Sequence, residues 1–348
     1  MASNVIKYIN NALLLDGMKK EMALASVLAT AVISGFAIFA NKFGVTGINS
    51  SVYTFARLII VAAFMFATIF FLGNFSQLKK LSRKQWLSLA AVGLVGGSIP
   101  FLLFFRGLQL VSGPAGSFIQ KTMFIFVAIV AVAFLKEKLN LGMIVGGILL
   151  LAGNFIFLQL WTQDFAWGTG HTLVLIATLF WAVENTYSKY LLRNMPGNVL
   201  AFGRMSFGSL FILVYLAFTG EIALMASLTQ DQMLWILATS VILFGYVLTW
   251  YNGLKDLSVT AATSILLLGS PITTALNHFF SDAAIIPAQI LGTVMILAGI
   301  IIMLVIAEKI TLPFQQQSRD VSCPCRLSWR QAHRMNLQPL FFPCRISQ

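Results

Sequence analysis

The sequence predicts an all-α integral membrane protein with ten transmembrane helices. Of its 348 residues 58% are apolar and only 10% are charged, and the mean hydropathy is +0.86. Because a soluble domain carries about 25% charged residues, a soluble enzyme is excluded. The apolar runs are about 20 residues long, the length of a bilayer-spanning helix, whereas β-barrel strands alternate over about ten residues.

Ten apolar runs follow one another, most of them separated by short connections with Gly, Pro, Asn or Ser. The expected spans are residues 22–41, 49–72, 85–105, 114–135, 141–161, 170–191, 197–219, 232–252, 258–280 and 285–307.

The two ends of the chain differ from this body. Residues 1–21 are too polar to span and lack the apolar core of a cleavable signal, so we expect a cytoplasmic leader or interfacial helix. Residues 308–348 turn to Gln, Arg, Pro and Cys, which predicts a disordered cytoplasmic tail. All three cysteines (Cys323, Cys325, Cys344) lie in that tail, so we expect no disulfide framework, metal site or cofactor in the body.

The net charge of +12 records topology rather than nucleic-acid binding. The ten-span arrangement places 18 of the 23 Lys and Arg residues on one side, two (Lys42 and Arg106) on the other and three within spans. By the positive-inside rule, both termini are expected in the cytoplasm. We therefore expect a multi-pass protein of the inner, cytoplasmic membrane, surrounded by lipid.

The chain also repeats itself at an offset of 146 to 147 residues. The matches are 106–112 with 252–258, Gly146 with Gly292, Gly153 with Gly299, Lys42 with Lys189, and Arg57 with Arg204. The halves, residues 22–161 and 170–307, hold five spans each. An odd number of spans makes the second half cross in the opposite direction, so we predict two inverted five-helix repeats, as in secondary transporters.

These motifs resemble the EamA-type family of the drug/metabolite transporter superfamily. The resemblance covers residues 22–307, and its carriers are Arg57 and Arg204, Gly107–Ser112 and Gly253–Ser258, Glu137–Leu139, and the paired glycines of the fifth and tenth spans. In the second half, Ser281-Asp282-Ala283 replaces the usual Gly-Glu. The resemblance implies a central cavity lined by the first four helices of each repeat, and export or exchange of amino acids or other small metabolites.

Four ionisable side chains lie well inside the expected spans, at a cost of roughly 2.5–3.5 kcal/mol each on insertion scales. They are Arg57, Lys121, Glu184 and Arg204. Glu184 is the one carboxylate among them, so proton coupling through an embedded acid has to use it; the alternative is that it neutralises a buried cation. Further candidates on or beside its helix face are Trp181, Asn185 and Tyr187.

Lys121, with Ser117 and Gln120 nearby, is a candidate ligand for a substrate carboxylate or phosphate. Its repeat mate is Leu267, and a cation that one half adds is a better specificity candidate than one that both halves keep. The alternative is that Lys121 snorkels to the interface. Arg57 and Arg204 occur in both halves, so we interpret them as secondary, mainly structural candidates that bond backbone carbonyls, with direct substrate contact as the alternative.

The ninth span carries a polar stripe near helical spacing, and the eighth span ends on aromatic and amide side chains. These candidates are Thr263, Ser270 and Thr274, and Trp250, Tyr251 and Asn252. Such a stripe either lines a wet cavity or joins helices.

The sequence thus predicts a secondary active transporter, an exporter or exchanger of small polar metabolites such as amino acids, working by alternating access. Protons are a candidate coupling ion, and a monomer or a homodimer fits equally. No phosphate-binding loop or catalytic cluster is found, which argues against ATP-driven transport and against an enzyme. The alternatives are an exporter of aromatic cations, with Glu184 and Trp181 as its site, and a non-transporting membrane enzyme or lipid scramblase.

Overall fold

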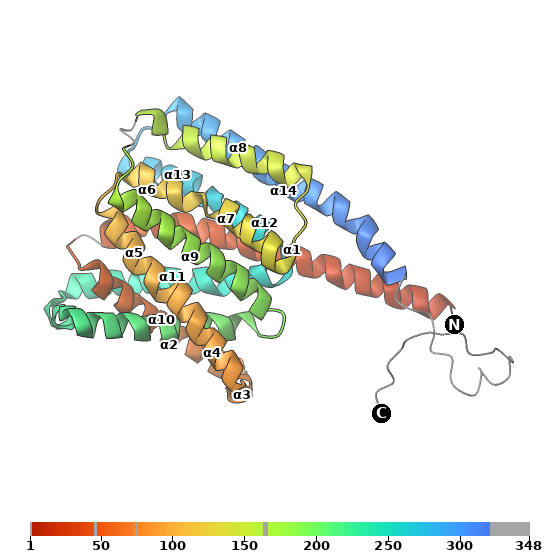
Figure 1. Cartoon of the computed structure of the whole chain (residues 1–348), viewed down its shortest axis with the longest axis horizontal. Coiled ribbons are helices and arrows are strands. Elements are labelled where there is room, and N and C mark those ends of the chain that lie inside the picture. Colours follow the sequence, from red (N-terminus) through yellow and green to blue (C-terminus); the bar gives the residue numbers. More distant parts are fainter. Residues whose placement is uncertain (1, 45–46, 74, 163–165, 321–348) are drawn as a thin grey trace. The chain divides into compact units, whose positions relative to one another are not determined.

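The computed structural model describes residues 2–44, 47–73, 75–162 and 166–320, with side chains for 18–41, 47–73, 75–162 and 166–304. Every regular element in these ranges is a helix (Figure 1). The chain forms one compact unit, Met1–Ile306, and a second unit, Ala307–Gln348. All that follows about contacts concerns the first unit.

The first half contains eight α-helices interrupted by two π-helical segments and followed by a short 3-10 turn. They are α1 (Ala2–Gly44), α2 (Ser50–Phe71), α3 (Phe75–Lys79), α4 (Arg83–Val92), η1 (π, Gly93–Ser98), α5 (Ile99–Leu108), α6 (Gly113–Lys121), α7 (Met123–Val130), η2 (π, Ala131–Leu135), α8 (Leu141–Phe157) and η3 (3-10, Leu160–Thr162).

The second half follows the same order with fewer interruptions. Its elements are α9 (Thr169–Leu191), α10 (Gly197–Thr219), η4 (3-10, Glu221–Ser227), α11 (Gln230–Asp256), α12 (Val259–Ile265), η5 (3-10, Leu266–Leu268), α13 (Gly269–Ser281) and α14 (Pro287–Asp320).

Eight segments of the described chain are long and apolar enough to cross a membrane, so the protein is an integral membrane protein. They are Met18–Asn41, Ser50–Phe71, Arg83–Leu108, Gly113–Leu135, Gly197–Thr219, Gln230–Asp256, Val259–Ser281 and Pro287–Leu304. The other two expected spans fall on α8, which is apolar but has only 17 residues, and on α9, which carries Glu184, Asn185 and Lys189. The count of ten spans stays a prediction.

Both ends of the body differ in detail from the sequence-based expectation. Residues 2–21 and the first expected span form one continuous helix, α1, rather than a separate leader. At the other end α14 continues to Asp320, so the first residues of the expected tail are helical. Residues 321–348, with all three cysteines, lie outside the described residues.

The repeated Gly-Leu-x-x-x-Ser motif has the same role in both halves. Ser112 Oγ accepts the Ala115 N–H at 3.4 Å, and Ser258 Oγ accepts the Ala261 N–H at 3.3 Å. Each serine is therefore an N-cap that begins the next helix.

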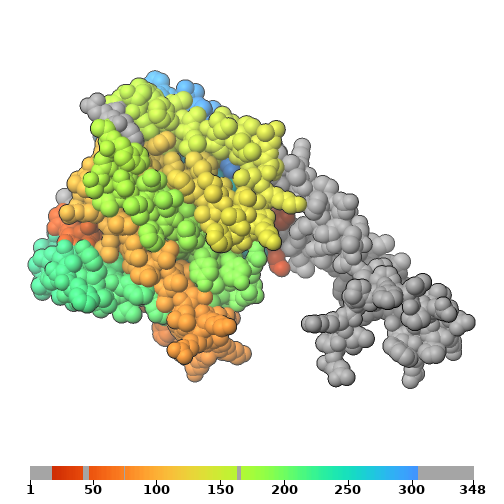
Figure 2. All heavy atoms as spheres, in the orientation of Figure 1, coloured from red at the N-terminus to blue at the C-terminus, as the bar shows by residue number. Residues whose placement is uncertain are grey.

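The glycine that opens each motif lets two helices approach closely. A Cβ at Gly107 would lie 2.7 Å from Val174 Cγ2, and one at Gly253 would lie 2.5 Å from Val27 Cγ2. Gly107 thus packs α5 on α9, and Gly253 packs α11 on α1. In the space-filling view, α5 (orange) adjoins α9 (yellow-green) (Figure 2).

Helices α8 and α14 pack through the paired glycines of the two halves, beside the rest of the bundle (Figure 1). A Cβ at Gly299 would lie 2.8 Å from Gly146 O, and one at Gly153 would lie 3.0 Å from Gly292 O. The spacing of these glycines in the sequence is therefore explained by a close helix contact, in which any side chain would separate the two backbones.

The outward faces of the helices carry large apolar side chains. Phe71, Phe134 and Phe218 are 83%, 79% and 88% exposed. Apolar exposure on this scale fits a surface solvated by lipid, where the backbone hydrogen bonds are satisfied within each helix.

Candidate functional site

A cavity of about 430 Å³, the central cavity, lies within the first unit between helices of both halves. Its wall combines polar and charged side chains with many aromatic ones. The lining includes Ala37, Asn41, Arg57, Phe101, Phe104, Ser117, Gln120, Lys121, Trp181, Asn185, Arg204, Tyr246, Trp250 and Thr263. They come from α1, α2, α5, α6, α9, α10, α11 and α12. Neither α8 nor α14 contributes to the wall.

Three cations line the central cavity, and no Asp or Glu is among its lining residues in the described chain. The cations are Arg57, Lys121 and Arg204. The lining side chains of this cavity therefore carry a net positive charge. An anionic group that offsets this charge has to lie behind the wall.

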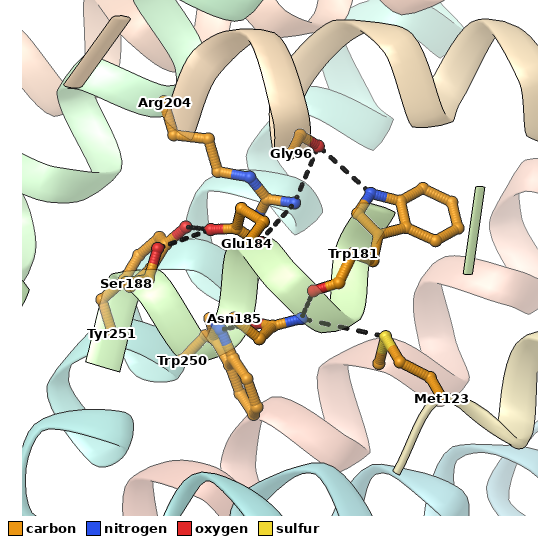
Figure 3. A network of polar contacts seen from close by, with 9 residues as sticks. All are labelled: Gly96, Met123, Trp181, Glu184, Asn185, Ser188, Arg204, Trp250 and Tyr251. Atoms are coloured by element: carbon orange, nitrogen blue, oxygen red, sulfur yellow. Dashed lines mark hydrogen bonds and ion pairs between the residues drawn. The ribbon is translucent and has the colours of Figure 1, made fainter. Parts of the chain in front are cut away.

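One such group lies behind the wall. Glu184 is 1% exposed, and its Oε2 lies 3.6 Å from Arg204 Nη2. Its Oε1 accepts hydrogen bonds from Ser188 Oγ at 2.6 Å and from Tyr251 OH at 2.9 Å (Figure 3). The carboxylate predicted as a coupling or binding residue is thus the counter-ion of Arg204 and does not face the cavity.

The same network fixes Trp181 in the cavity wall through one backbone carbonyl. Gly96 O accepts from Arg204 Nη2 and from Trp181 Nε1, each at 3.1 Å (Figure 3). Gly96 lies in the π-helix η1, whose wide turn leaves carbonyls outside the regular α-helical pattern. A Cβ at Gly96 would lie 2.2 Å from Glu184 Cγ, so the network requires glycine here.

Below Trp181, Asn185 ties three helices together. Asn185 Nδ2 donates to Trp181 O at 2.8 Å and approaches Met123 Sδ at 3.8 Å, while its Oδ1 accepts from Trp250 Nε1 at 3.1 Å (Figure 3). Tyr246 stacks on Trp250, with ring centroids 6.4 Å apart. Asn185, Trp250 and Tyr246 of the cavity wall are therefore held in place by contacts with one another and with neighbouring helices.

The other two cations have no carboxylate partner among the described residues. Lys121 Nζ donates to the backbone carbonyl of Leu266 at 3.4 Å. The Arg57 guanidinium lies over the Tyr53 ring at 5.0 Å, and Arg57 Nε is buried without a hydrogen-bond partner. Both side chains can therefore still bind an anion.

Several predicted site residues lie elsewhere. Tyr187 is on the surface and donates its hydroxyl to Ser88 Oγ at 2.9 Å. Asn252 is exposed, and Tyr251 belongs to the network behind the wall. Of the polar stripe in the ninth span, Thr263 lines the cavity whereas Ser270 and Thr274 do not, because the 3-10 turn η5 interrupts the helix between them. Apart from Glu184, the remaining predicted residues lie together around the cavity.

Sequence reasoning missed the phenylalanines of α5. Phe101 and Phe104 pack edge-on against Trp181, with ring centroids 5.3 and 5.2 Å apart. Their spacing of three placed them on one helix face, but thirty phenylalanines give no contrast between a cavity wall and a lipid-facing surface.

Charged side chains close one end of the bundle, away from the cavity. Glu137 Oε1 accepts the Val259 N–H at 3.0 Å, and its Oε2 accepts from Thr260 Oγ1 at 2.9 Å. Lys189 Nζ donates to the carbonyls of Leu254 and Lys255 at 2.9 and 2.8 Å. Each group caps a helix end of complementary charge: an acid at the start of α12 and a base at the end of α11.

A helical membrane bundle with a cavity of charged, polar and aromatic side chains between its two halves is the architecture of a membrane transporter. The model of the EamA-like transporter family matches the chain twice, over residues 21–159 and 168–305. The chain therefore belongs to the EamA-like transporter family.

Curated relatives carry names of the same kind. An uncharacterized transporter of Archaeoglobus fulgidus is 27% identical over 82% of this chain and 98% of its own length. The uncharacterized transporter YoaV of Bacillus subtilis is 24% identical over 80% of this chain and 94% of its own length. The uncharacterized inner membrane transporter YhbE of Escherichia coli is 25% identical over 53% of this chain and 60% of its own length.

A solved crystal structure shares the fold. It superposes with a TM-score of 0.69 and 17% sequence identity, over 83% of this chain and 98% of that chain.

Proposed function

We propose that this protein is a secondary active transporter that moves small polar metabolites across the cytoplasmic membrane by alternating access. The observation that carries the proposal is the central cavity, whose wall is drawn from the first four expected spans of each half and combines cations, amides and aromatic rings. A volume of about 430 Å³ falls in the range of small-molecule sites.

The contacts between halves suggest how access alternates. The Glu137 hydrogen bonds to Val259 and Thr260 join the halves at one end of the bundle. Exposing the cavity at that end requires these hydrogen bonds to break, and a rocking of one half against the other would break them together. We place this end and both termini in the cytoplasm, because the positive-inside rule assigns 18 cations to that side.

Export of aromatic cations is the less favoured alternative. It needs a carboxylate that faces the substrate, but Glu184 lies behind the wall and is paired with Arg204. A cationic substrate would instead meet Arg57 and Lys121. Like charges in a site of low dielectric constant repel strongly, so the lining argues against this class of substrate.

The test is solute counterflow in liposomes that contain the purified protein. Liposomes preloaded with an unlabelled pool of amino acids and organic acids are diluted into a trace of each labelled compound. A transient accumulation of label above equilibrium, absent from protein-free liposomes, is the expected result. If none of the compounds accumulates, the proposal is overturned. If a labelled phospholipid moves across the bilayer instead, the result favours a scramblase.

A further inference from the structure

The two arginines that match across the repeat have different surroundings. Arg204 has Glu184 beside it at 3.6 Å. Arg57 matches Arg204 at an offset of 147 residues, and at the same offset the position that matches Glu184 is Ala37. Ala37 and Arg57 both line the central cavity. The first half therefore keeps the cation but lacks the carboxylate that neutralises it in the second half.

Arg57 is held in place by its neighbours although its charge is uncompensated. The guanidinium lies over the ring of Tyr53, which is fully buried. The Tyr53 hydroxyl lies 2.8 Å from Asn41 Oδ1 and 2.9 Å from Thr239 Oγ1, so the ring beneath Arg57 is fixed. Arg57 itself is 8% exposed, and its Nε has no hydrogen-bond partner in the described chain. Since an arginine stays protonated, a buried guanidinium in this state is a ready partner for an anion.

The rest of the wall adds a second cation and no acidic group. Lys121 is held only by a long contact of 3.4 Å to a backbone carbonyl, a neutral acceptor. The amide oxygen of Asn185 accepts from Trp250 Nε1, which leaves one lone pair for a further donor. A carboxylate would find charged partners in this cavity, whereas an ammonium group would find neutral acceptors such as Gln120 but no carboxylate among the described lining residues.

We propose that the central cavity selects small organic anions over zwitterions and cations, with Arg57 as the residue that binds the carboxylate and Lys121 as a second cation that favours the same charge. The aromatic wall of Phe101, Phe104 and Trp181 receives the apolar part of the ligand. This inference rests on the proposed function, because the proposed function identifies the cavity as the transport site. The inference narrows the substrate class from polar metabolites to carboxylates without an amino group.

The first experiment measures binding of three probes with the same body to the purified full-length protein by isothermal titration calorimetry. The probes are 3-phenylpropionate (anion), phenylalanine (zwitterion) and phenethylamine (cation). We expect phenylpropionate to bind at least about tenfold more tightly than phenylalanine, because phenylalanine adds an ammonium group to a wall that carries the unpaired cations Arg57 and Lys121, and we expect phenethylamine, which lacks the carboxylate, not to bind. Equal affinities for the first two probes, or no binding of phenylpropionate, would overturn the inference.

The second experiment restores the missing carboxylate. Ala37→Glu puts a carboxylate into the same cavity wall as Arg57, at the position that matches Glu184 in the repeat, and Ala37→Gln is the matched control of the same size without the charge. We expect Ala37→Glu to lose about tenfold or more in phenylpropionate affinity relative to Ala37→Gln. Arg57→Gln should lose affinity similarly, and Arg57→Lys should retain part of it. Thermal melting of each variant establishes that it is folded. Equal affinities of Ala37→Glu and Ala37→Gln, or full affinity in Arg57→Gln, would refute the role of Arg57.

Failure of the inference and failure of the proposed function give different results. If the protein binds phenylpropionate in the predicted pattern but moves no probe in counterflow, the anion site stands and the transport proposal fails. If counterflow occurs with phenylalanine as readily as with phenylpropionate, transport stands and anion selection fails.

Discussion

Replacing Glu184 by Gln removes the negative charge from the network behind the cavity. It puts an amide of nearly the same shape in place of the carboxylate. The amide oxygen can still accept from Ser188 Oγ and Tyr251 OH. Arg204 cannot compensate in the same way, because it is 7% exposed and its ion pair with Glu184 is lost. The substitution therefore isolates the charge of Glu184 from its shape.

The magnitude follows from the geometry. Two unit charges 3.6 Å apart attract by about 4–5 kcal/mol at an effective dielectric constant of about 20. Breaking a buried pair by removing one partner costs about 3–5 kcal/mol, since the other charge is left uncompensated. We therefore expect Glu184→Gln to lower the free energy of unfolding by about 3–5 kcal/mol, a range that includes both figures.

The assay is unfolding of the purified protein in mixed micelles, with Arg204→Gln and the double variant completing a mutant cycle. The double variant should lose less stability than the sum of the single losses, by about 2 kcal/mol or more. Asp282→Asn is the matched carboxylate-to-amide control, at an exposed position with a φ of 50° that Asn tolerates. It should change the free energy of unfolding by less than about 0.5 kcal/mol.

The cycle also separates a structural role of Glu184 from proton coupling. If Glu184 carries the coupled proton, flux driven by a pH gradient is lost in the single variant and stays lost in the double variant, although the double variant loses less stability than the sum of the single losses. A loss of stability in Glu184→Gln below about 1 kcal/mol, or additivity within about 0.5 kcal/mol, would refute the buried-pair reasoning.

Three further predictions concern single positions. Gly96→Ala should destabilise the protein by about 1–3 kcal/mol in the same unfolding assay, because its Cβ would lie 2.2 Å from Glu184 Cγ; an unchanged midpoint would contradict the close packing. Glu137→Gln should lower the free energy of unfolding by about 0.5–2 kcal/mol, since it removes the charge that caps α12 at Val259; equal stability would mean that the charge contributes nothing there. Lys121→Met should weaken phenylpropionate binding in calorimetry by about threefold or more while the protein stays folded, and retained affinity would exclude Lys121 from binding.

The charge pattern at the site could be predicted only in part. The four embedded ionisable residues could be identified from the sequence. We interpreted Arg57 and Arg204 as equivalent, because they match in the repeat. Arg204 does bond a backbone carbonyl, that of Gly96, as expected. Arg57 differs because position 37 holds an alanine, and this matters only once α1 and α2 are seen to meet at the same cavity.

The aromatic wall and the position of Glu184 lay beyond sequence reasoning for a related reason. Helical spacing determines which residues share a face, and it does not tell which neighbour that face meets. Glu184 and Asn185 are adjacent in sequence, yet Asn185 lines the cavity and Glu184 lies behind it. The π-helix η1 also has no clear sequence signature, although it places the carbonyl that joins Arg204 and Trp181.

The sequence by itself determined that this is a helical membrane protein and that its halves share motifs. It also determined, to within a few residues, the positions at which eight of the spans begin and end. These properties follow from the length of apolar runs and from local caps, which depend on neighbouring residues only. The tertiary structure decided which charges are paired and which face the cavity. That outcome depends on contacts between residues far apart in the chain, as between Glu184 in α9 and Arg204 in α10, so no local pattern can encode it.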